Sequence, residues 1–166
     1  QYARQEELAR RETLVGERQR LMRDMHDGIG GQLMGLLFAS RRQPIPQAEL
    51  TESLQLVIDE LRLIIDSLDT VGETLGTALA TFRARIQPKL SAAGIELRWS
   101  NMLPDTIDNL GAREVLQIFR IVQEAVTNVI KHAHSETIDV DIGTDDAGAI
   151  TIAIADEGTG IGTSQG

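Results

Sequence analysis

The sequence predicts an α+β fold in which an antiparallel helical hairpin is followed by an α/β sandwich. Residues 1–40 contain no proline and carry apolar residues three or four apart, the spacing of a long helix. Pro44 and Pro46 interrupt this pattern before a second apolar stripe begins. From Gly72 onward, helical patterns alternate with short apolar runs typical of strands. We therefore expect two domains, residues 1–71 and residues 72–166.

The composition limits the classes of function. Of the 166 residues, 42% are apolar but only 3% aromatic, which favours helices packed through aliphatic stripes. A net charge of -9 argues against a nucleic-acid partner. Because the chain has no cysteine, disulfides and thiolate metal sites are excluded.

No apolar run approaches the roughly 18 residues that a membrane span requires, and no signal peptide is visible. We therefore expect a cytoplasmic location, including that of the cytoplasmic part of a membrane-bound sensor. A sensor domain upstream would then supply the stimulus.

The hairpin requires a partner to bury its apolar stripes. The first helix carries a stripe of five residues, and residues 1–20 before it are highly charged, as in a signal-input coiled coil. The second helix should begin near Gln47 with a heptad-like stripe. Each Leu or Ile left in water forfeits roughly 1.5–3 kcal/mol. We therefore predict a homodimer whose two hairpins form a four-helix bundle. The stripes are Met22, Met25, Ile29, Leu33 and Leu36, then Leu50, Leu54, Val57, Leu61, Ile64 and Leu68, widened by Ile58 and Ile65.

The second half should contain helices over residues 73–93 and 113–133 and strands over residues 95–99, 138–142 and 150–155. Gly94 is the expected end of the first of these helices, and residues 145–148 are an expected hairpin turn. The longer helix should face a core with Leu116, Phe119, Val122, Val126 and Ile130. Only three strands are expected, so the sheet looks incomplete.

His26 and Asp27 form the first candidate site. They lie in mid-helix, and Gly28, Gly30 and Gly31 follow them. A glycine inside a helix costs about 1 kcal/mol relative to alanine, so three of them predict close approach by another body. A carboxylate can take the ring proton or fix the tautomer of an imidazole while the other ring nitrogen attacks. The plainer alternative is a pair of surface side chains.

Glu124 and Asn128 form the second candidate site. They are four residues apart and share a helical face, where a carboxylate and an amide could hold Mg²⁺. Lys131 and His132 follow and could reach phosphate oxygens. A polar helix face with no ligand is the alternative. A metal site built from His132 and His134 is disfavoured, because two histidines two residues apart diverge.

The third candidate site is the segment from Asp156 to Gly162, which follows an apolar strand. A buried acid at a strand end can accept a hydrogen bond from an exocyclic amine. Gly158, Gly160 and Gly162 would let the backbone approach a flat ring or a phosphate. A plain turn is the alternative.

Together these motifs resemble those of a known family. Residues 121–133, IVQEAVTNVIKHA, resemble the N-box of the histidine-kinase and GHKL ATPase superfamily, and residues 156–162, DEGTGIG, resemble its first glycine box. Residues 17–33, ERQRLMRDMHDGIGGQL, resemble the H-box of sensor histidine kinases of the NarL/DesK/LiaS-like subfamily, which have a HisKA_3 dimerisation and phosphoacceptor domain. The order of these three motifs and their separation along the chain also fit the family pattern, and the resemblance covers nearly the whole chain.

The resemblance implies a protein-histidine kinase, with residues 1–71 as the dimerisation and histidine phosphotransfer hairpin and residues 72–166 as the ATP-binding domain. His26 would be the phosphoacceptor and Asp27 its base. Asn128 would bind the metal, Glu124 would help through water, and Lys131 and His132 would lie beside the phosphates. The remaining members of the implied nucleotide site are Asp156, which would read the adenine amine, and Gly158, Gly160 and Gly162, which would shape the pocket. The implied ligands are ATP and Mg²⁺, and the implied partner is a NarL/LuxR-type response regulator that receives the phosphate on an aspartate.

Two departures from the family pattern stand out. The second glycine box, the ATP lid and the last strands are not in this sequence, so we expect an ATP domain that is incomplete at its C-terminal end. Gly31 stands where the subfamily often has Gln or His for phosphatase chemistry, and Gln32 is turned about 100° away on a helix. The alternative function is a non-catalytic dimerisation and docking scaffold. Other GHKL ATPases, such as serine-kinase anti-sigma factors or chaperone-like ATPases, do not need the hairpin.

Overall fold

The computed structural model describes residues 2–70, 73–104, 107 and 110–158. Contacts divide the chain into two compact units. The helical unit comprises Gln1–Val71 and Gly111–Leu116, and the α/β unit comprises Gly72–Leu110 and Gln117–Gly166. None of the described helices is both long enough and apolar enough to cross a membrane.

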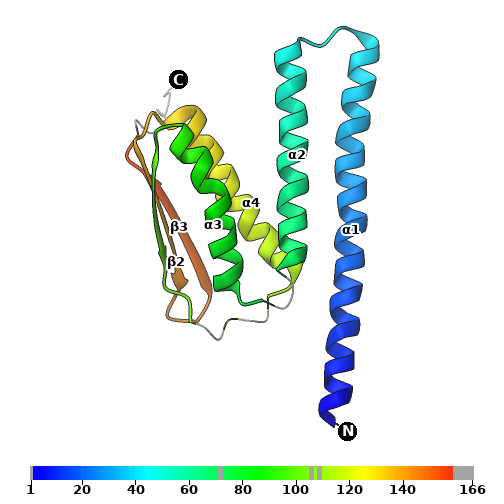
Figure 1. Ribbon diagram of the computed structural model, residues 1–166, viewed down its shortest axis with the longest axis vertical. Coiled ribbons are helices and arrows are strands. Elements are labelled where there is room, and N and C mark those ends of the chain that lie inside the picture. Colours follow the sequence, from blue (N-terminus) through cyan, green and yellow to red (C-terminus); the bar gives the residue numbers. More distant parts are fainter. Residues whose placement is uncertain (1, 71–72, 105–106, 108–109, 159–166) are drawn as a thin grey trace. The chain divides into compact units, whose positions relative to one another are not determined.

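The helical unit is built on two long antiparallel helices, α1 (Tyr2–Arg42) and α2 (Gln47–Asp69), which lie side by side (Figure 1). A short connection that contains both prolines joins them, as the sequence predicts. Pro46 occupies the N-cap of α2, where a proline does not remove a helical hydrogen bond. The predicted helical hairpin is therefore confirmed.

The apolar stripe of α1 is only partly buried within one chain. Ile29 is buried and Met25 is half-buried, as expected, but Met22 and Leu33 are exposed. In α2, Val57, Ile64 and Leu68 are buried, whereas Leu54 is exposed. A single neighbouring helix covers only one side of a wide stripe, so the remaining apolar residues stay in contact with water.

In the α/β unit, helix α3 (Leu75–Ala92) and the part of α4 (Ala112–Asn128) from Gln117 onward cover one face of a three-stranded sheet (Figure 1). The strands are β1 (Glu96–Asn101), β2 (Thr137–Thr144) and β3 (Ile150–Asp156), in the order β1-β2-β3. β1 pairs with β2 in parallel, and β2 pairs with β3 in antiparallel orientation. The predicted helices and strands are confirmed, with bounds shifted by a few residues.

Local sequence signals explain how these elements begin and end. Thr74 caps α3 because its Oγ1 accepts a hydrogen bond from the backbone N–H of Thr77, at 3.2 Å. Gly94, at φ 73°, ends α3 and lets the N–H of Ile95 donate to the carbonyl of Leu90, at 2.9 Å. Between β2 and β3, the Asp145 carboxylate accepts from two backbone N–H groups of the predicted turn.

Aliphatic side chains and one aromatic pair form the core of the α/β unit. The rings of Phe82 and Phe119 stack with centroids 4.6 Å apart and planes 7° apart, which joins α3 to α4. The centre of this core is shielded from solvent within one chain, whereas Ile152 and Ile154 of the edge strand β3 are only half-buried. Its fully buried members are Leu79, Phe82, Ile86, Leu90, Phe119, Val122, Val126, Ile138, Val140 and Ile142.

One core prediction is wrong. Ile130 is 38% exposed, and its neighbour Val129 is buried instead. The prediction extended the α-helical repeat to Ala133, but α4 ends at Asn128 and a π-helical turn, Val129–Ala133, follows it. Ile130 therefore lies outside the 3.6-residue repeat on which the expectation rested.

Candidate functional site

His26 and Asp27 project from the middle of α1 into open surroundings. Each side chain is 86% exposed, and the His26 Nδ1 lies 3.9 Å from an Asp27 carboxylate oxygen. This separation is longer than a hydrogen bond, but rotation of either exposed side chain can shorten it. An imidazole in this position is accessible to a large phosphorylated ligand, and the carboxylate is near enough to exchange a proton with it.

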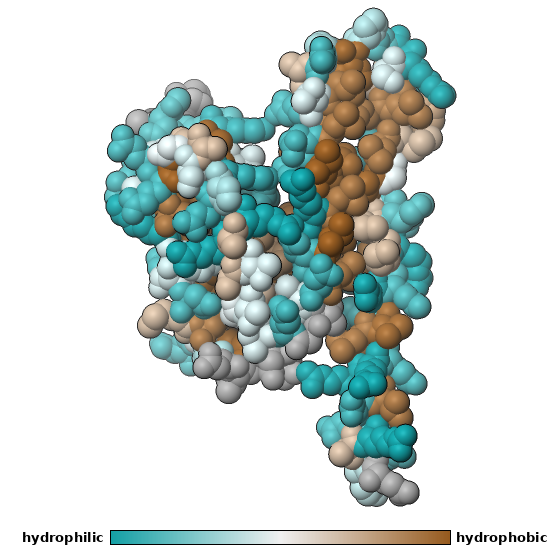
Figure 2. All heavy atoms as spheres, viewed as in Figure 1, coloured by the Kyte–Doolittle hydropathy of each residue, from teal (hydrophilic) through white to brown (hydrophobic). Residues whose placement is uncertain are grey.

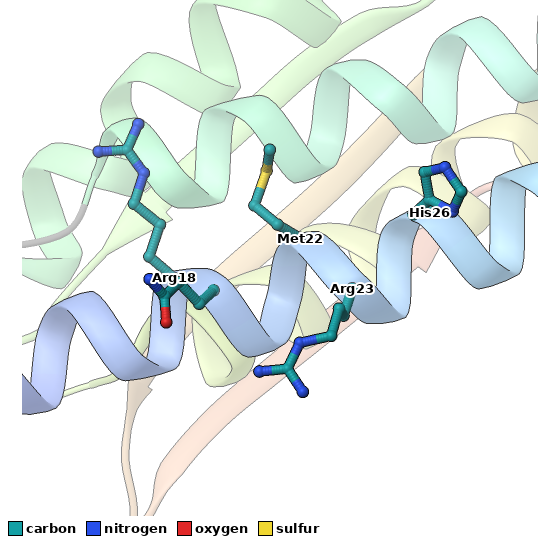
Figure 3. A pocket seen from close by; sticks show the side chains of 5 residues that line it. Arg18, Met22, Arg23 and His26 are labelled. Atoms are coloured by element: carbon teal, nitrogen blue, oxygen red, sulfur yellow. The ribbon is translucent and has the colours of Figure 1, made fainter.

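Basic and apolar side chains of α1 surround His26. Arg18, Met22 and His26 recur at intervals of four residues and therefore share one side of the helix. Together with Gln19 and Arg23 they line a shallow surface hollow. Figure 3 shows Arg18, Met22 and His26 on one side of α1, whereas Arg23 points to the other. The hollow is thus cationic at one end and carries the imidazole at the other.

The glycines after His26 make no close contact within one chain. A Cβ atom added at Gly28, Gly30 or Gly31 would meet no neighbouring side chain or other element within 4 Å. The sequence predicts that another molecule or domain approaches the helix closely at these glycines, and no described part of this chain does so. The surface beside His26 is therefore accessible on the helical unit as described.

Glu124 and Asn128 lie together on the exposed side of α4. The opposite side carries the buried residues Phe119, Val122 and Val126, so the two polar side chains point away from the core. Within the described residues, neither side chain makes a hydrogen bond or an ion pair. A carboxylate and an amide oxygen one turn apart fit the oxygen ligands that Mg²⁺ prefers, with water completing its shell.

Lys131 and His132 lie in the π-helical turn that continues α4, and both are exposed. His134 follows the turn and adopts the left-handed conformation at φ 48°. Wide turns of this kind occur mostly as single turns within helices and frequently at functional sites. The sequence did not predict the turn, because the hydrogen-bond pattern that defines it has no clear sequence signal.

Asp156 is the last residue of β3. Alternation along the strand places Asp156 on the same face as Ile152 and Ile154, which is the face that the helices cover. Its carboxylate accepts a hydrogen bond from the backbone N–H of Gly158, at 2.8 Å. The expectation of a buried acid is wrong, because Asp156 is exposed at the end of a strand that has only one neighbour among the described residues. Gly158 is half-buried, and Gly160 and Gly162 lie outside the described residues.

The topology brings the second and third candidate sites to one end of the α/β unit. The π turn ends at Ala133, and β2 begins at Thr137. Since β3 runs antiparallel to β2, its last residue, Asp156, pairs with Ile138 at the start of β2. Two motifs that are separated by more than twenty residues in sequence therefore meet beside the first residues of β2.

Comparison with known proteins supports a specific ATPase class for this part of the chain. Residues 114–165 match the family model HATPase_c, described as histidine kinase-, DNA gyrase B- and HSP90-like ATPase. The match includes Glu124, Asn128 and Asp156. It implies use of ATP by this region.

Two curated relatives are sensor histidine kinases. The chain is 28% identical to the sensor histidine kinase MctS of Rhizobium johnstonii, over 90% of this chain and 34% of the relative. It is 25% identical to the sensor histidine kinase LiaS of Bacillus subtilis, over 94% of this chain and 45% of the relative. The chain thus spans between a third and a half of the length of these relatives. The matches support a histidine-kinase type of GHKL ATPase core.

A solved structure supports the fold. The blue-light activated histidine kinase of Erythrobacter litoralis EL346 superposes with a TM-score of 0.55 at 15% identity, over 87% of this chain and 48% of that one. At this identity the match concerns the fold alone.

Proposed function

We propose that this chain is the core of a two-component sensor histidine kinase that transfers the γ-phosphate of ATP to His26. The observation that carries the proposal is that the segments following Asn128 and Asp156 meet beside the start of β2, within a region, residues 114–165, that matches an ATPase family. Both relatives carry a histidine kinase name, and the alignments extend over the helical unit as well. The exposed His26 on that unit is then the acceptor.

The nucleotide would bind beside the second half of α4. Asp156 would accept a hydrogen bond from the exocyclic amine of adenine, and Gly158 would allow the ring to approach the backbone. Lys131 and His132 would lie beside the phosphates, where their positive charge or N–H groups favour phosphate oxygens. Gly160 and Gly162 would extend the pocket as implied by the glycine-box resemblance.

Glu124 and Asn128 would hold Mg²⁺, directly or through water. When bound, the ion would neutralise charge that develops on phosphate oxygens during transfer. The two side chains need little rearrangement for this role, because both are exposed and neither is engaged by another described residue.

His26 would attack the γ-phosphorus through one ring nitrogen. A nitrogen–phosphorus bond forms, the bond from the γ-phosphorus to the bridging oxygen breaks, and ADP leaves. The other ring nitrogen loses its proton to Asp27, whose carboxylate is 3.9 Å from Nδ1 before any rotation. Catalysis of this kind depends mainly on positioning and charge neutralisation.

The same hairpin would form a homodimer and bind the response regulator. Figure 2 shows apolar side chains gathered along α2 and the upper part of α1. Many of these side chains are between 40% and 55% exposed within one chain, which is costly for large apolar groups. They are Met22, Leu33, Met34, Leu37, Phe38, Leu54, Leu56, Ile58 and Ile65. A NarL/LuxR-type regulator would then receive the phosphate from His26 on an aspartate.

Incubation of the chain with γ-labelled ATP and Mg²⁺ tests this proposal. We expect label that is stable to base and labile to acid, as a phosphoramidate is. The label should be absent from His26→Gln and from Asn128→Ala, but present in His134→Gln, which changes a histidine outside the proposed machinery. A docking scaffold without catalysis would show no label in any of these proteins, and label retained by His26→Gln would place the acceptor elsewhere.

A further inference from the structure

Glu157, between the acid Asp156 and Gly158, is held by groups from two other parts of the α/β unit. We propose that Ser135, assisted by Arg98, positions Glu157 and thereby sets the orientation of Asp156 toward the adenine base. Both would be positioning residues, since neither is expected to touch the nucleotide. The inference rests on the proposed nucleotide site and adds the element that fixes its selectivity for the base.

The hydroxyl of Ser135 is fully used in three hydrogen bonds. It donates to the carbonyl of Thr137 at 2.7 Å and accepts from the backbone N–H of Thr137 at 3.3 Å and of Glu157 at 3.1 Å. Ser135 comes directly after His134, the left-handed residue that follows the π turn. One half-buried side chain therefore connects the end of the α4 motif to the backbone just after Asp156.

Arg98 holds the side chain of the same residue from β1. Its Nη1 lies 3.7 Å from the Glu157 carboxylate and 3.9 Å from that of Asp139 on β2. Alternation along the strands places Arg98 and Asp139 on the face of the sheet opposite the helices. Glu157 is thus attached to the outer face, whereas Asp156 lies on the helix-covered face.

The two attachments differ in strength. The Arg98 and Glu157 side chains are 50% and 69% exposed, and ion pairs that are this accessible to water contribute little. The hydrogen bond from the Glu157 N–H to Ser135 is also exposed, but it constrains the backbone itself and ends on a half-buried hydroxyl that is fixed by two further hydrogen bonds to Thr137. Ser135 should therefore contribute most of the positioning, and Arg98 a smaller part.

The consequence concerns base recognition. Loss of the Ser135 hydroxyl would leave Glu157 attached to the sheet through an exposed ion pair, and the Asp156 carboxylate held by its local hydrogen bond to the Gly158 N–H. Asp156 would then sample several orientations, and its hydrogen bond to an exocyclic amine would weaken. Contacts made by Lys131, Asn128 and the metal to the phosphates would be unaffected. Adenine selectivity should therefore fall more than phosphate affinity.

The experiment compares Ser135→Ala, Ser135→Thr and the control Ser100→Ala by calorimetric titration with ADP and with GDP, both in Mg²⁺. Ser100 is a half-buried serine of β1 and makes no hydrogen bond through its side chain within the described residues. We expect Ser135→Ala to weaken ADP binding roughly three- to tenfold, the effect of one hydrogen bond. GDP binding should change less than twofold. Ser135→Thr, which keeps the hydroxyl, should restore the preference for ADP, and Arg98→Gln should reduce it by about twofold.

Hydrogen exchange of the Glu157 amide gives a second readout that needs no nucleotide. Exchange should accelerate in Ser135→Ala and remain at the wild-type rate in Ser100→Ala. An unchanged ADP preference or unchanged Glu157 exchange in Ser135→Ala would overturn the positioning role. Failure of the wild-type chain to bind ADP would instead refute the proposed function, and the positioning role with it.

Discussion

The two units of the chain bury their apolar residues to very different extents. In the α/β unit, side chains such as Phe119, Val122 and Ile138 are at most 1% exposed, so one chain shields the centre of the core. In the helical unit, Leu37, Phe38 and Ile65 are between 42% and 54% exposed. A unit that shields the centre of its own core can act as a separate binding module, whereas two helices with uncovered stripes require a second surface. The difference is what the proposed pairing of a nucleotide module with a dimerisation module would require.

A charge on the uncovered stripe should have the largest effect. In a symmetric dimer, Leu37→Glu places one carboxylate from each chain in the interface. It should weaken dimerisation by roughly 3–6 kcal/mol in total, because two leucines lose their apolar contribution. We expect the wild-type chain to be a dimer and Leu37→Glu to be a monomer in light scattering. Gln32→Glu, which adds the same charge at an exposed polar position of α1, should remain dimeric. A dimeric Leu37→Glu protein would show that the interface lies elsewhere.

A cavity in the shielded core should be nearly as damaging. Phe119 is 1% exposed and stacks on Phe82, so Phe119→Ala should lower the free energy of unfolding by about 3–5 kcal/mol. Trp99, the only tryptophan, lies in β1 and reports unfolding of the α/β unit by fluorescence in denaturant. The same substitution at the 54% exposed Phe38 should leave the tryptophan transition within about 0.5 kcal/mol of the wild type. Equal losses in the free energy of unfolding for Phe119→Ala and Phe38→Ala would contradict the stated difference in burial between the two units.

A change at the nucleotide site should alter binding but not folding. Asp156→Asn replaces an acceptor carboxylate with an amide and should weaken ADP binding by roughly ten- to a hundredfold, the usual worth of a hydrogen bond to a charged group. Asp141→Asn, on the opposite face of the sheet, should bind ADP as the wild type does. Calorimetric titration measures both variants, and equal affinities would argue that Asp156 does not contact the base.

The smallest expected effect concerns a helix cap in the α/β unit. Thr74→Ala removes the acceptor for the Thr77 N–H and should lower the free energy of unfolding by about 1 kcal/mol. Thr151→Ala, an exposed threonine of β3, is the control and should cost less because it has no capping role. The tryptophan transition in urea measures both. A loss in Thr74→Ala no larger than that in Thr151→Ala would show that α3 does not depend on this cap.

Sequence rules predicted the elements whose signals are local. The prolines between α1 and α2, Gly94 after α3 and the turn at Asp145 each determine the conformation of a few neighbouring residues, and the structure follows them. The rules did not reveal the parallel pairing of β1 with β2, because strand partners depend on contacts far apart in sequence.

Among the site residues, too, local spacing predicted some features, whereas others depend on contacts that are distant in sequence. Spacing alone placed Glu124 and Asn128 on one exposed face, and the structure agrees. Spacing did not predict that Val129 would be buried and Ile130 exposed, because the helix changes to a π turn at this point. The exposure of Asp156 depends on how many strands flank β3, which its own sequence does not encode. The contribution of Ser135 depends on the register of β2 and β3 and therefore became visible only in the fold.

The most direct measurement is a map of backbone amide chemical shifts in the chain during titration with ADP and Mg²⁺. If nucleotide binding and phosphate acceptance reside in different units, the shifts should change around Glu124 to His132 and around Asp156 to Gly158. The amides next to His26 should remain unchanged until ATP is supplied. Shift changes concentrated on α1, or no changes at saturating ADP, would contradict this division of the two roles.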